Sequence, residues 1–341
     1  DTVSFVPADA TALDDRWELG ARERVRNGQP IVAKRRAEGD PSGFDWHPGM
    51  PRAFREMDLG GLALAQLLFL LAVLTIVTRW WRLLALAGCP TSWRNALRLT
   101  FLGLFFNNVL PGATGGDLVK GVMVAKENKG RGAEALVTVL VDRVFGMIAL
   151  ALLALVVILL APGEEFDALR ASLLWGLGLC ALGTGLYASK SFRRKVGLSA
   201  LVNRLPVAEK LRSLDRAALQ YLKQPGAVAI AFLFSFVNHA LVTLGVYVLG
   251  GALGVSGVSL AQYFVLVPVA NLISAVPLAP GGWGVGELAF RGLFLMIHAS
   301  PAMGVAVSVT FRLSQLAIGL LGGLFLLFPG SRDELRDARK E

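Results

Sequence analysis

The segment Asn107–Lys120, with the sequence NNVLPGATGGDLVK, interrupts a chain that otherwise consists largely of long apolar runs. It combines two amides, a proline, three glycines, a carboxylate and an amine. A helix that faces lipid cannot leave the backbone groups freed near Pro111 unpaired, because hydrocarbon offers no hydrogen-bond partner. We therefore expect this segment, here called the first break, to be a re-entrant or broken helix that lies inside the protein beside a site.

A second interrupted segment, the second break, covers Asn271–Glu287 and reads NLISAVPLAPGGWGVGE. Both breaks contain, in order, an amide, a proline, paired glycines and a carboxylate that opens a helix. The corresponding residues are Asn108, Pro111, Gly115, Gly116 and Asp117 in the first break and Asn271, Pro280, Gly281, Gly282 and Glu287 in the second. Paired interruptions are typical of transporters whose repeats meet at a midplane site. Because the spacings differ, the sequence leaves a pseudo-repeat open.

The composition is that of a membrane protein. The 341 residues are 54% hydrophobic and only 17% charged, and the apolar residues are gathered into blocks. We therefore predict an all-α polytopic integral membrane protein, a helical bundle with two broken segments. The net charge of +9 lies mainly in short loops without the aromatic–basic pattern of a nucleic-acid-binding protein, so it indicates membrane orientation. Cys89 and Cys180 stand alone, which indicates neither a disulfide framework nor a metal site, and no cofactor is expected.

The apolar blocks also predict topology. Runs at residues 62–78, 134–160, 172–188, 226–250, 260–276 and 303–328 read as membrane helices, whereas 99–106 is too short to cross. A further apolar run, 288–298, follows the second break. The first run ends in Arg79-Trp80-Trp81-Arg82, which we interpret as an interfacial aromatic pair flanked by cations. Residues 190–223 form the most basic loop, which we place in the cytoplasm with the C-terminus. We thus expect a multi-pass protein of the cell inner membrane.

The chain is expected to have three parts. Residues 1–58 are polar and contain short alternating runs such as Thr2–Val6, which are typical of strands. We predict a small β-rich extramembrane module there, outside the membrane, through which an envelope protein is a candidate partner. Residues 59–330 form the predicted transmembrane domain, and residues 331–341 form a cytoplasmic tail.

Several ionisable residues lie inside the apolar runs, where such groups usually face a bundle interior or a wet cavity and pair with one another. They are Asp117, Lys120, Asp142, Arg143, His239, Glu287, Arg291 and Arg312. Asp142 and Arg143 are adjacent, so they cannot share a helix face and each needs a partner elsewhere, unless they anchor a helix end at the interface. For Arg312 we expect a cross-helix pair with Glu287 or Asp117, although Glu287 and Arg291 also have favourable i, i+4 spacing. His239 is expected to hydrogen-bond between helices rather than to relay protons.

The first break allows two interpretations. If the chain resumes as a helix after Gly116, Asp117 and Lys120 share a face, and the helix N-terminus offers free N–H groups and a positive dipole end to an anion such as phosphate. Alternatively, Asp117 caps the helix and Lys120 extends to water. The charges in the other spans favour the first interpretation.

Three ordered motifs resemble a known family. They are FFNNVLPGATGGDLVKG at 105–121, VTVLVDRVFG at 137–146 and PLAPGGWGVGELAF at 277–290. Together they resemble the lysylphosphatidylglycerol synthase transmembrane, or flippase-like, family, which includes the membrane half of the multiple peptide resistance factor. The resemblance covers about residues 59–328 and implies a lipid-handling domain with re-entrant segments. Through the matching motifs, the resemblance also implies a set of site residues: Asn108, Pro111, Gly115, Gly116, Asp117, Asp142, Arg143, Pro280, Gly281, Gly282, Gly284 and Glu287.

The residues after Phe328 leave no room for the aminoacyl transferase domain of that factor, so we do not expect a lipid aminoacyl synthase. We predict translocation of an anionic phospholipid or lipid-linked headgroup through a polar cavity between the breaks. Asn107 joins the candidate cavity residues named above, none of which is assigned a catalytic role, and membrane lipids rather than nucleic acid are the expected partners. Two alternatives stay open: a membrane transferase with Asp117 or Glu287 as base, and a structural envelope partner.

Overall fold

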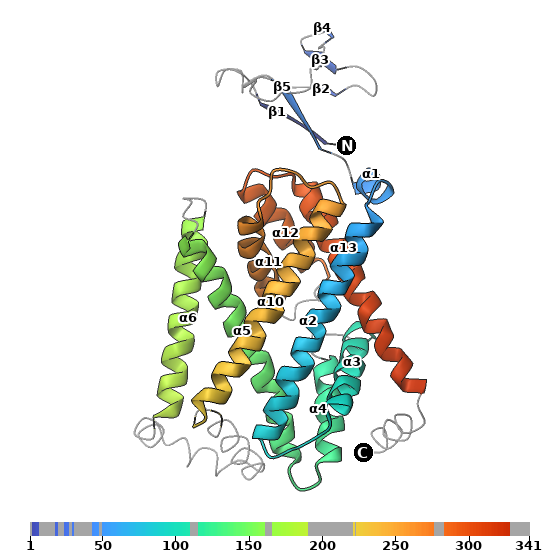
Figure 1. Cartoon of the computed structure of the whole chain (residues 1–341). Helices are drawn as coiled ribbons and strands as arrows, with labels where there is room; N and C mark the ends of the chain where they lie inside the picture. The colour runs from blue at the N-terminus through green and yellow to red at the C-terminus, as the bar shows by residue number, and fades with distance from the viewer. Residues whose placement is uncertain are drawn as a thin grey trace. The chain divides into compact units, whose positions relative to one another are not determined.

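A computed structural model gives the fold of the chain (Figure 1). It describes residues 2–6, 18–19, 24–26, 29–30, 43–47, 50–109, 115–160, 166–189, 221, 223–275 and 283–327. The predicted site residues Pro111, Pro280, Gly281 and Gly282 and the predicted tail at residues 331–341 lie outside the described residues. The chain divides into two compact units, Asp1–Met57 and Asp58–Glu341.

The first unit contains short strand segments and one short helix. The strands are β1 (Thr2–Val6), β2 (Glu18–Leu19), β3 (Arg24–Arg26), β4 (Gln29–Pro30) and β5 (Gly43–His47), and the helix is α1 (Met50–Arg55). β1 pairs with β5, and β2, β3 and β4 form a second antiparallel set. These fragments do not support the β-rich module that the alternating runs predict, because β1 and β5 form an isolated two-stranded pair and β2, β3 and β4 have only two or three residues each.

The second unit is helical throughout its described residues. Its elements are α2 (Leu59–Leu86), α3 (Trp93–Val109), α4 (Gly115–Glu127), α5 (Gly132–Leu160), α6 (Asp167–Ala188), α10 (Pro225–Ala252), α11 (Leu260–Ser274), α12 (Val285–Met296), α13 (Pro301–Leu324) and a final 3₁₀ turn, η4 (Phe325–Leu327). Five of these, α2, α5, α6, α10 and α13, are long and apolar enough to cross a membrane. The prediction of an all-α polytopic membrane protein is confirmed.

The four remaining helices enter and leave the two breaks. α3 ends and α4 begins within the first break, and α11 ends and α12 begins within the second. With 13 residues, α4 is about 20 Å long at 1.5 Å per residue, which is short of a hydrocarbon core of about 30 Å. In Figure 1, α3 and α4 lie near the end of the bundle where α2 finishes, whereas α11 and α12 lie near the opposite end, where α10 finishes.

Two copies of one four-helix pattern make up most of this unit. α2 and α10 both have 28 residues, and each is followed by a glycine with positive φ, Gly88 (73°) and Gly254 (80°). This left-handed conformation ends both helices, as is usual at a helix C-terminus. The next helices, α3 and α11, begin in the same way, because the hydroxyls of Ser92 and Ser259 accept a hydrogen bond from the backbone N–H three residues later.

The rest of the pattern repeats as well. The turn between α4 and α5 has a left-handed residue at Gly130, and the turn between α12 and α13 has one at His298. The copies run in opposite directions: the N–H of Asp58, before α2, donates to the carbonyl of Ala252, at the end of α10, at 3.0 Å. Figure 1 shows α2 and α10 antiparallel. The structure therefore contains a pseudo-repeat of inverted topology, α2–α5 and α10–α13.

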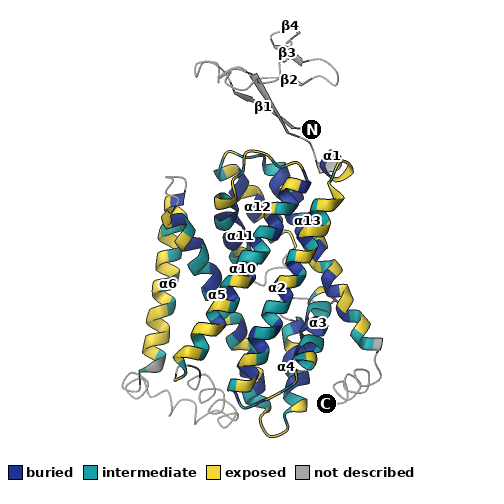
Figure 2. Cartoon of the chain, viewed as in Figure 1, coloured by how far each residue is buried: buried dark blue, intermediate teal, exposed yellow. Residues whose placement is uncertain are grey.

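Close helix contacts fix the position of α3 in the core. A Cβ atom at Gly116 of α4 would overlap the carbonyl oxygen of Gly103 in α3, and one at Gly322 of α13 would overlap the carbonyl of Phe101. Small residues let membrane helices approach this closely. By contrast, α6 is exposed along most of its length (Figure 2), so it faces the bilayer.

Candidate functional site

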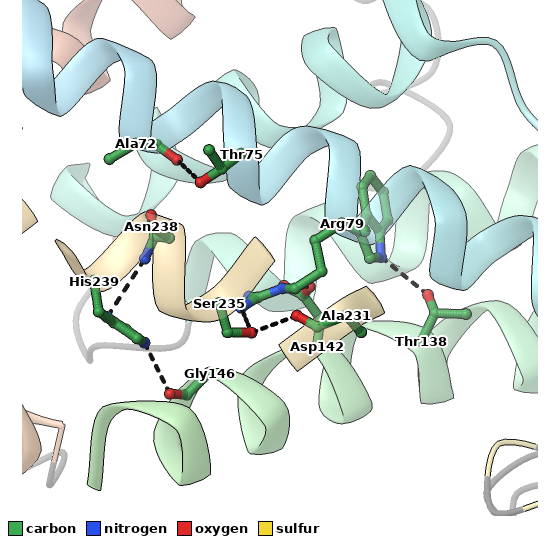
Figure 3. Close-up of polar contacts among 11 residues, drawn as sticks. Ala72, Thr75, Arg79, Thr138, Asp142, Gly146, Ala231, Ser235, Asn238 and His239 are labelled. Carbon is green, nitrogen blue, oxygen red and sulfur yellow. Dashed lines mark hydrogen bonds and ion pairs between the residues drawn. The ribbon is translucent and has the colours of Figure 1, made fainter. Parts of the chain in front are cut away.

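The most buried ion pair of the described structure joins α2 to α5. The Nε atom of Arg79 lies 2.8 Å from Oδ1 of Asp142, and its Nη1 donates to the hydroxyl of Ser235 in α10 at 2.6 Å (Figure 3). Arg79 is 5% exposed and Asp142 is 7% exposed. The interpretation of Arg79 and its neighbours as an interfacial helix end is wrong, because α2 continues to Leu86 and Asp142 neutralises the arginine inside the bundle.

Arg143, the neighbour of Asp142, faces a different helix. Its Nη1 donates to Oδ2 of Asp117, in the first turn of α4, at 2.6 Å. The two adjacent residues therefore have separate partners, as predicted from their spacing on a helix. The alternative of an interfacial anchor is wrong for Asp142 and Arg143, since both are ion-paired to neighbouring helices.

Lys120 is buried and does not extend to water. It is 4% exposed, and its Nζ atom lies 3.7 Å from the centre of the Trp80 ring, a cation–π contact. Trp80 is held in place because its indole N–H donates to the hydroxyl of Thr138 at 3.0 Å. In the described part of the chain, Lys120 has no carboxylate within ion-pair distance. The backbone N–H of Gly116, in the first turn of α4, donates to the side-chain oxygen of Asn107 at 2.8 Å. Asn107 therefore caps α4 in place of the predicted Asp117.

These groups meet around a cavity of about 280 Å³, here called the first cavity. Its lining includes Arg79, Asn107, Asp117, Lys120, Asp142 and Arg143. Each of the two ion pairs is neutral in itself. The Lys120 ammonium is therefore one excess positive charge among the described lining residues.

The lining also contains polar atoms that lack a partner among the described residues. The hydroxyl of Thr100 and the side-chain oxygen of Asn238 are buried without a hydrogen bond. Burying such groups unpaired is costly, so they indicate a bound ligand or water. His239 also lines the cavity, and its Nε2 lies 2.9 Å from the Gly146 carbonyl of α5 (Figure 3). The predicted interhelical hydrogen bond of His239 is thus confirmed.

A second ion pair of the same kind involves the last residue of the second break. The Nε atom of Arg312 in α13 lies 2.8 Å from Oε1 of Glu287, in the first turn of α12. This confirms the predicted cross-helix pair of Arg312 with Glu287. The other oxygen of Glu287 accepts the N–H of Gly284 at 2.6 Å, where φ is 81°. Arg291 is exposed and forms no described pair with Glu287, so the alternative i, i+4 pairing is wrong.

Arg312 borders a second cavity of about 300 Å³. The other polar lining residues are Arg143, Asn271, Ser274, Ser308 and Gln315. Arg143 and Ala275 line both cavities. The two breaks are thereby brought to one shared interior, as their polar sequences predict.

The remaining predicted site residues lie beside the cavities. Gly115 begins α4 and Gly116 packs on α3, while Asn108 is exposed with its amide against Gly319 of α13. Sequence reasoning missed Arg79, Thr100, Ser235 and Gly286. A Cβ at Gly286 would overlap the Arg312 guanidinium, and its place in the motif GVGE was the only sequence signal for it. Arg79 gave no signal because a cation beside tryptophans usually marks an interface.

The fold and the cavities together define a class: a polytopic helical membrane protein with two inverted halves and a charged interior. Residues 42–323 match the family described as the lysylphosphatidylglycerol synthase TM region, and the chain belongs to this family. The predicted resemblance is therefore confirmed.

Similar proteins are found among archaea. The chain is 26% identical over 308 residues to a UPF0104 membrane protein of Pyrococcus horikoshii, a match that covers 83% of this chain and 92% of the relative. It is 24% identical over 296 residues to a UPF0104 membrane protein of Methanothermobacter thermautotrophicus, covering 80% of this chain and 84% of the relative. A second protein of that organism is 26% identical over 286 residues, covering 76% and 82%.

Proposed function

We propose that the protein translocates lipid, moving an anionic phospholipid or lipid-linked headgroup between the two breaks while the acyl chains stay in the bilayer. The observation that carries this proposal is the position of Arg143, which lines both cavities. A headgroup that leaves one cavity would meet the other at a shared cation. Family membership supports a lipid-related role.

The inverted repeat supports the same proposal. In transporters, such repeats place a binding site near the midplane, and their relative motion opens it to each side in turn. We interpret α3–α4 and α11–α12 as re-entrant hairpins that enter from opposite faces of the membrane. The pairs Asp117–Arg143 and Glu287–Arg312 would then hold each hairpin against the following span and break when that side opens.

The orientation follows from charge. The basic segment at residues 190–223 favours the cytoplasm, which would place the C-terminus there and residues 1–58 outside the cell inner membrane. Five described helices are candidate spans, and an odd number puts the start of α2 and the end of α13 on opposite sides.

The arrangement of carboxylates disfavours the alternative of a transferase. Asp117, Asp142 and Glu287 each lie within 2.8 Å of an arginine nitrogen. A general base must contact the proton that it removes. Each of these carboxylates already contacts an arginine, so the three residues fit charge compensation better. Intact lipid recovered from the opposite leaflet, rather than covalently altered lipid, would separate the two functions.

The test uses the purified full chain in liposomes that contain an anionic lipid with a fluorescent label. We expect the double variant Glu287→Gln/Arg312→Gln to translocate this lipid at least about tenfold more slowly, because the ion pair joins α12 to α13 and a loss of about 1.4 kcal/mol in the barrier already gives this factor. Both residues are changed together so that neither Glu287 nor Arg312 is left as a buried charge without its partner. Translocation is measured as label that becomes accessible to an external quencher.

The matched control is Arg94→Ala, because Arg94 is exposed and lines neither cavity. Its translocation rate should stay close to that of the wild-type protein. Equal rates for the wild-type protein, the double variant and empty liposomes would contradict the proposed function.

A further inference from the structure

The inverted repeat makes it possible to compare the two halves residue by residue. Asp117 and Glu287 are each the third residue of their helix, and Arg143 and Arg312 are each the twelfth. These positions form the same ion pair in both halves. The two halves therefore correspond in their contacts as well as in sequence position. A residue that differs between equivalent positions points to a task that only one half performs.

The buried cluster of Arg79, Asp142 and Ser235 has an apolar counterpart. Counted from the start of each helix, the equivalent residues are Gly245, Phe311 and Phe69. These three are also in contact: the rings of Phe69 and Phe311 are 5.1 Å apart, and a Cβ at Gly245 would overlap the Phe69 ring. The same place in the fold thus holds charges in one half and aromatic rings in the other.

The excess charge is confined to the first half in the same way. Lys120, the sixth residue of α4, corresponds to Phe290, the sixth of α12. Thr100, the eighth residue of α3, corresponds to Val267, the eighth of α11. Both counterparts are buried and apolar. The carboxylate–arginine pair is common to the halves, whereas the positions equivalent to Lys120 and Thr100 carry no polar group in the second half.

The features of Lys120 are those of a recognition residue. It is a buried cation in contact with Trp80, and it lines the first cavity with the unpartnered hydroxyl of Thr100. A buried charge without a counter-ion is expensive, and an anion in the cavity would compensate it. The volume of about 280 Å³ is at the small end for ligand pockets, which suits a headgroup better than a whole lipid.

We propose that Lys120 and Thr100 form a phosphate-binding subsite that belongs to the α3–α4 side alone. The subsite recognises a phosphate group, either of a lipid headgroup or free. The second cavity, with its ion-paired Arg312 and amide of Asn271, accepts the polar headgroup without an excess charge. The lipid form of this proposal rests on the proposed translocation.

Binding to the full chain in neutral detergent micelles tests the subsite. The probes are short-chain phosphatidic acid, the matching diacylglycerol and inorganic phosphate, each titrated by calorimetry. We expect Lys120→Met to weaken phosphatidic acid binding about ten- to hundredfold, the loss of a charge-assisted contact, with equal or higher thermal stability. Thr100→Val, which keeps the side-chain shape, should weaken binding by a smaller factor.

Lys126→Met is the matched control, because it removes the same charge from the same helix outside the cavity. It should leave the affinity within about twofold, far below the effect of losing a charge-assisted contact. Equal affinity for Lys120→Met and wild type, or equal loss in Lys126→Met, would overturn the subsite. Binding of inorganic phosphate but not phosphatidic acid, dependent on Lys120, would support the subsite with free phosphate as its ligand.

Two results separate a failure of the phosphate-binding subsite from a failure of the proposed translocation. Lys120-dependent phosphatidic acid binding without translocation by the wild-type protein would refute translocation and retain the subsite. Translocation that is equally fast in Lys120→Met and wild type, with unchanged binding, would retain translocation and refute the subsite.

Discussion

Asp142→Ala is expected to destabilise the protein by about 3–5 kcal/mol, the usual cost of removing one partner of a buried ion pair. The reason is that Arg79 would keep its charge in the bundle with the hydroxyl of Ser235 as its remaining described hydrogen-bond partner. The free energy of unfolding can be measured by titrating denaturing detergent into mixed micelles and following helix content.

Two further variants test this explanation. Arg79→Leu/Asp142→Leu removes both charges and should recover most of the lost stability, because the counterpart in the other half is already apolar. Asp167→Ala removes a carboxylate from an exposed pair with Arg170 and should change stability by no more than about 0.5 kcal/mol. A loss in Asp142→Ala no larger than in Asp167→Ala would show that the buried pair has no special role.

Gly116→Ala is expected to separate α3 from α4 and to destabilise the protein by about 1–3 kcal/mol, as overpacking typically does. The new Cβ would overlap the carbonyl oxygen of Gly103 and lie 2.7 Å from the backbone nitrogen of Asn107. Backbone atoms cannot rotate away, so the helices must move apart. Since Asn107 and Asp117 line the first cavity, phosphate binding should weaken together with the free energy of unfolding.

Gly176→Ala provides the matched control for this prediction. Gly176 lies in the exposed helix α6, and a Cβ there would meet no atom within 4 Å. The substitution should be neutral or should stabilise the helix by up to about 1 kcal/mol, because alanine favours helix over glycine. If Gly116→Ala is as stable as Gly176→Ala, the close approach of α3 and α4 does not constrain the fold.

Few charges recur between the two halves, because the halves share only one task that needs them. The repeated pair, a first-turn carboxylate with an arginine on the next span, ties each short helix to a long one. That task is the same in both halves. Recognition of a ligand needs only one binding surface, which accounts for the lysine at 120 and the phenylalanine at the equivalent position 290.

The sequence by itself determined the helices, the two breaks and the carboxylates that open α4 and α12. These features are local: apolar length decides which segments span, and glycine and proline decide where a helix stops. Even the separate partners of Asp142 and Arg143 could be predicted, because adjacent residues on a helix face different ways. For Arg312, the rule that charges inside a membrane pair with one another narrowed the expected partner to Glu287 or Asp117.

Only the tertiary structure decided which distant side chains meet. Arg79 finds Asp142 and Ser235, and Lys120 finds Trp80, because α2, α4, α5 and α10 pack together, and no local pattern encodes that arrangement. The sequence suggested a repeat only through the order of parts in the two breaks. The tertiary structure decided that the repeat exists and is inverted, because the other equivalent positions are turn glycines, capping serines and an ion pair rather than similar stretches of sequence. In the first break, the sequence specified a polar interruption, and helix packing made it one wall of a cavity with an excess positive charge.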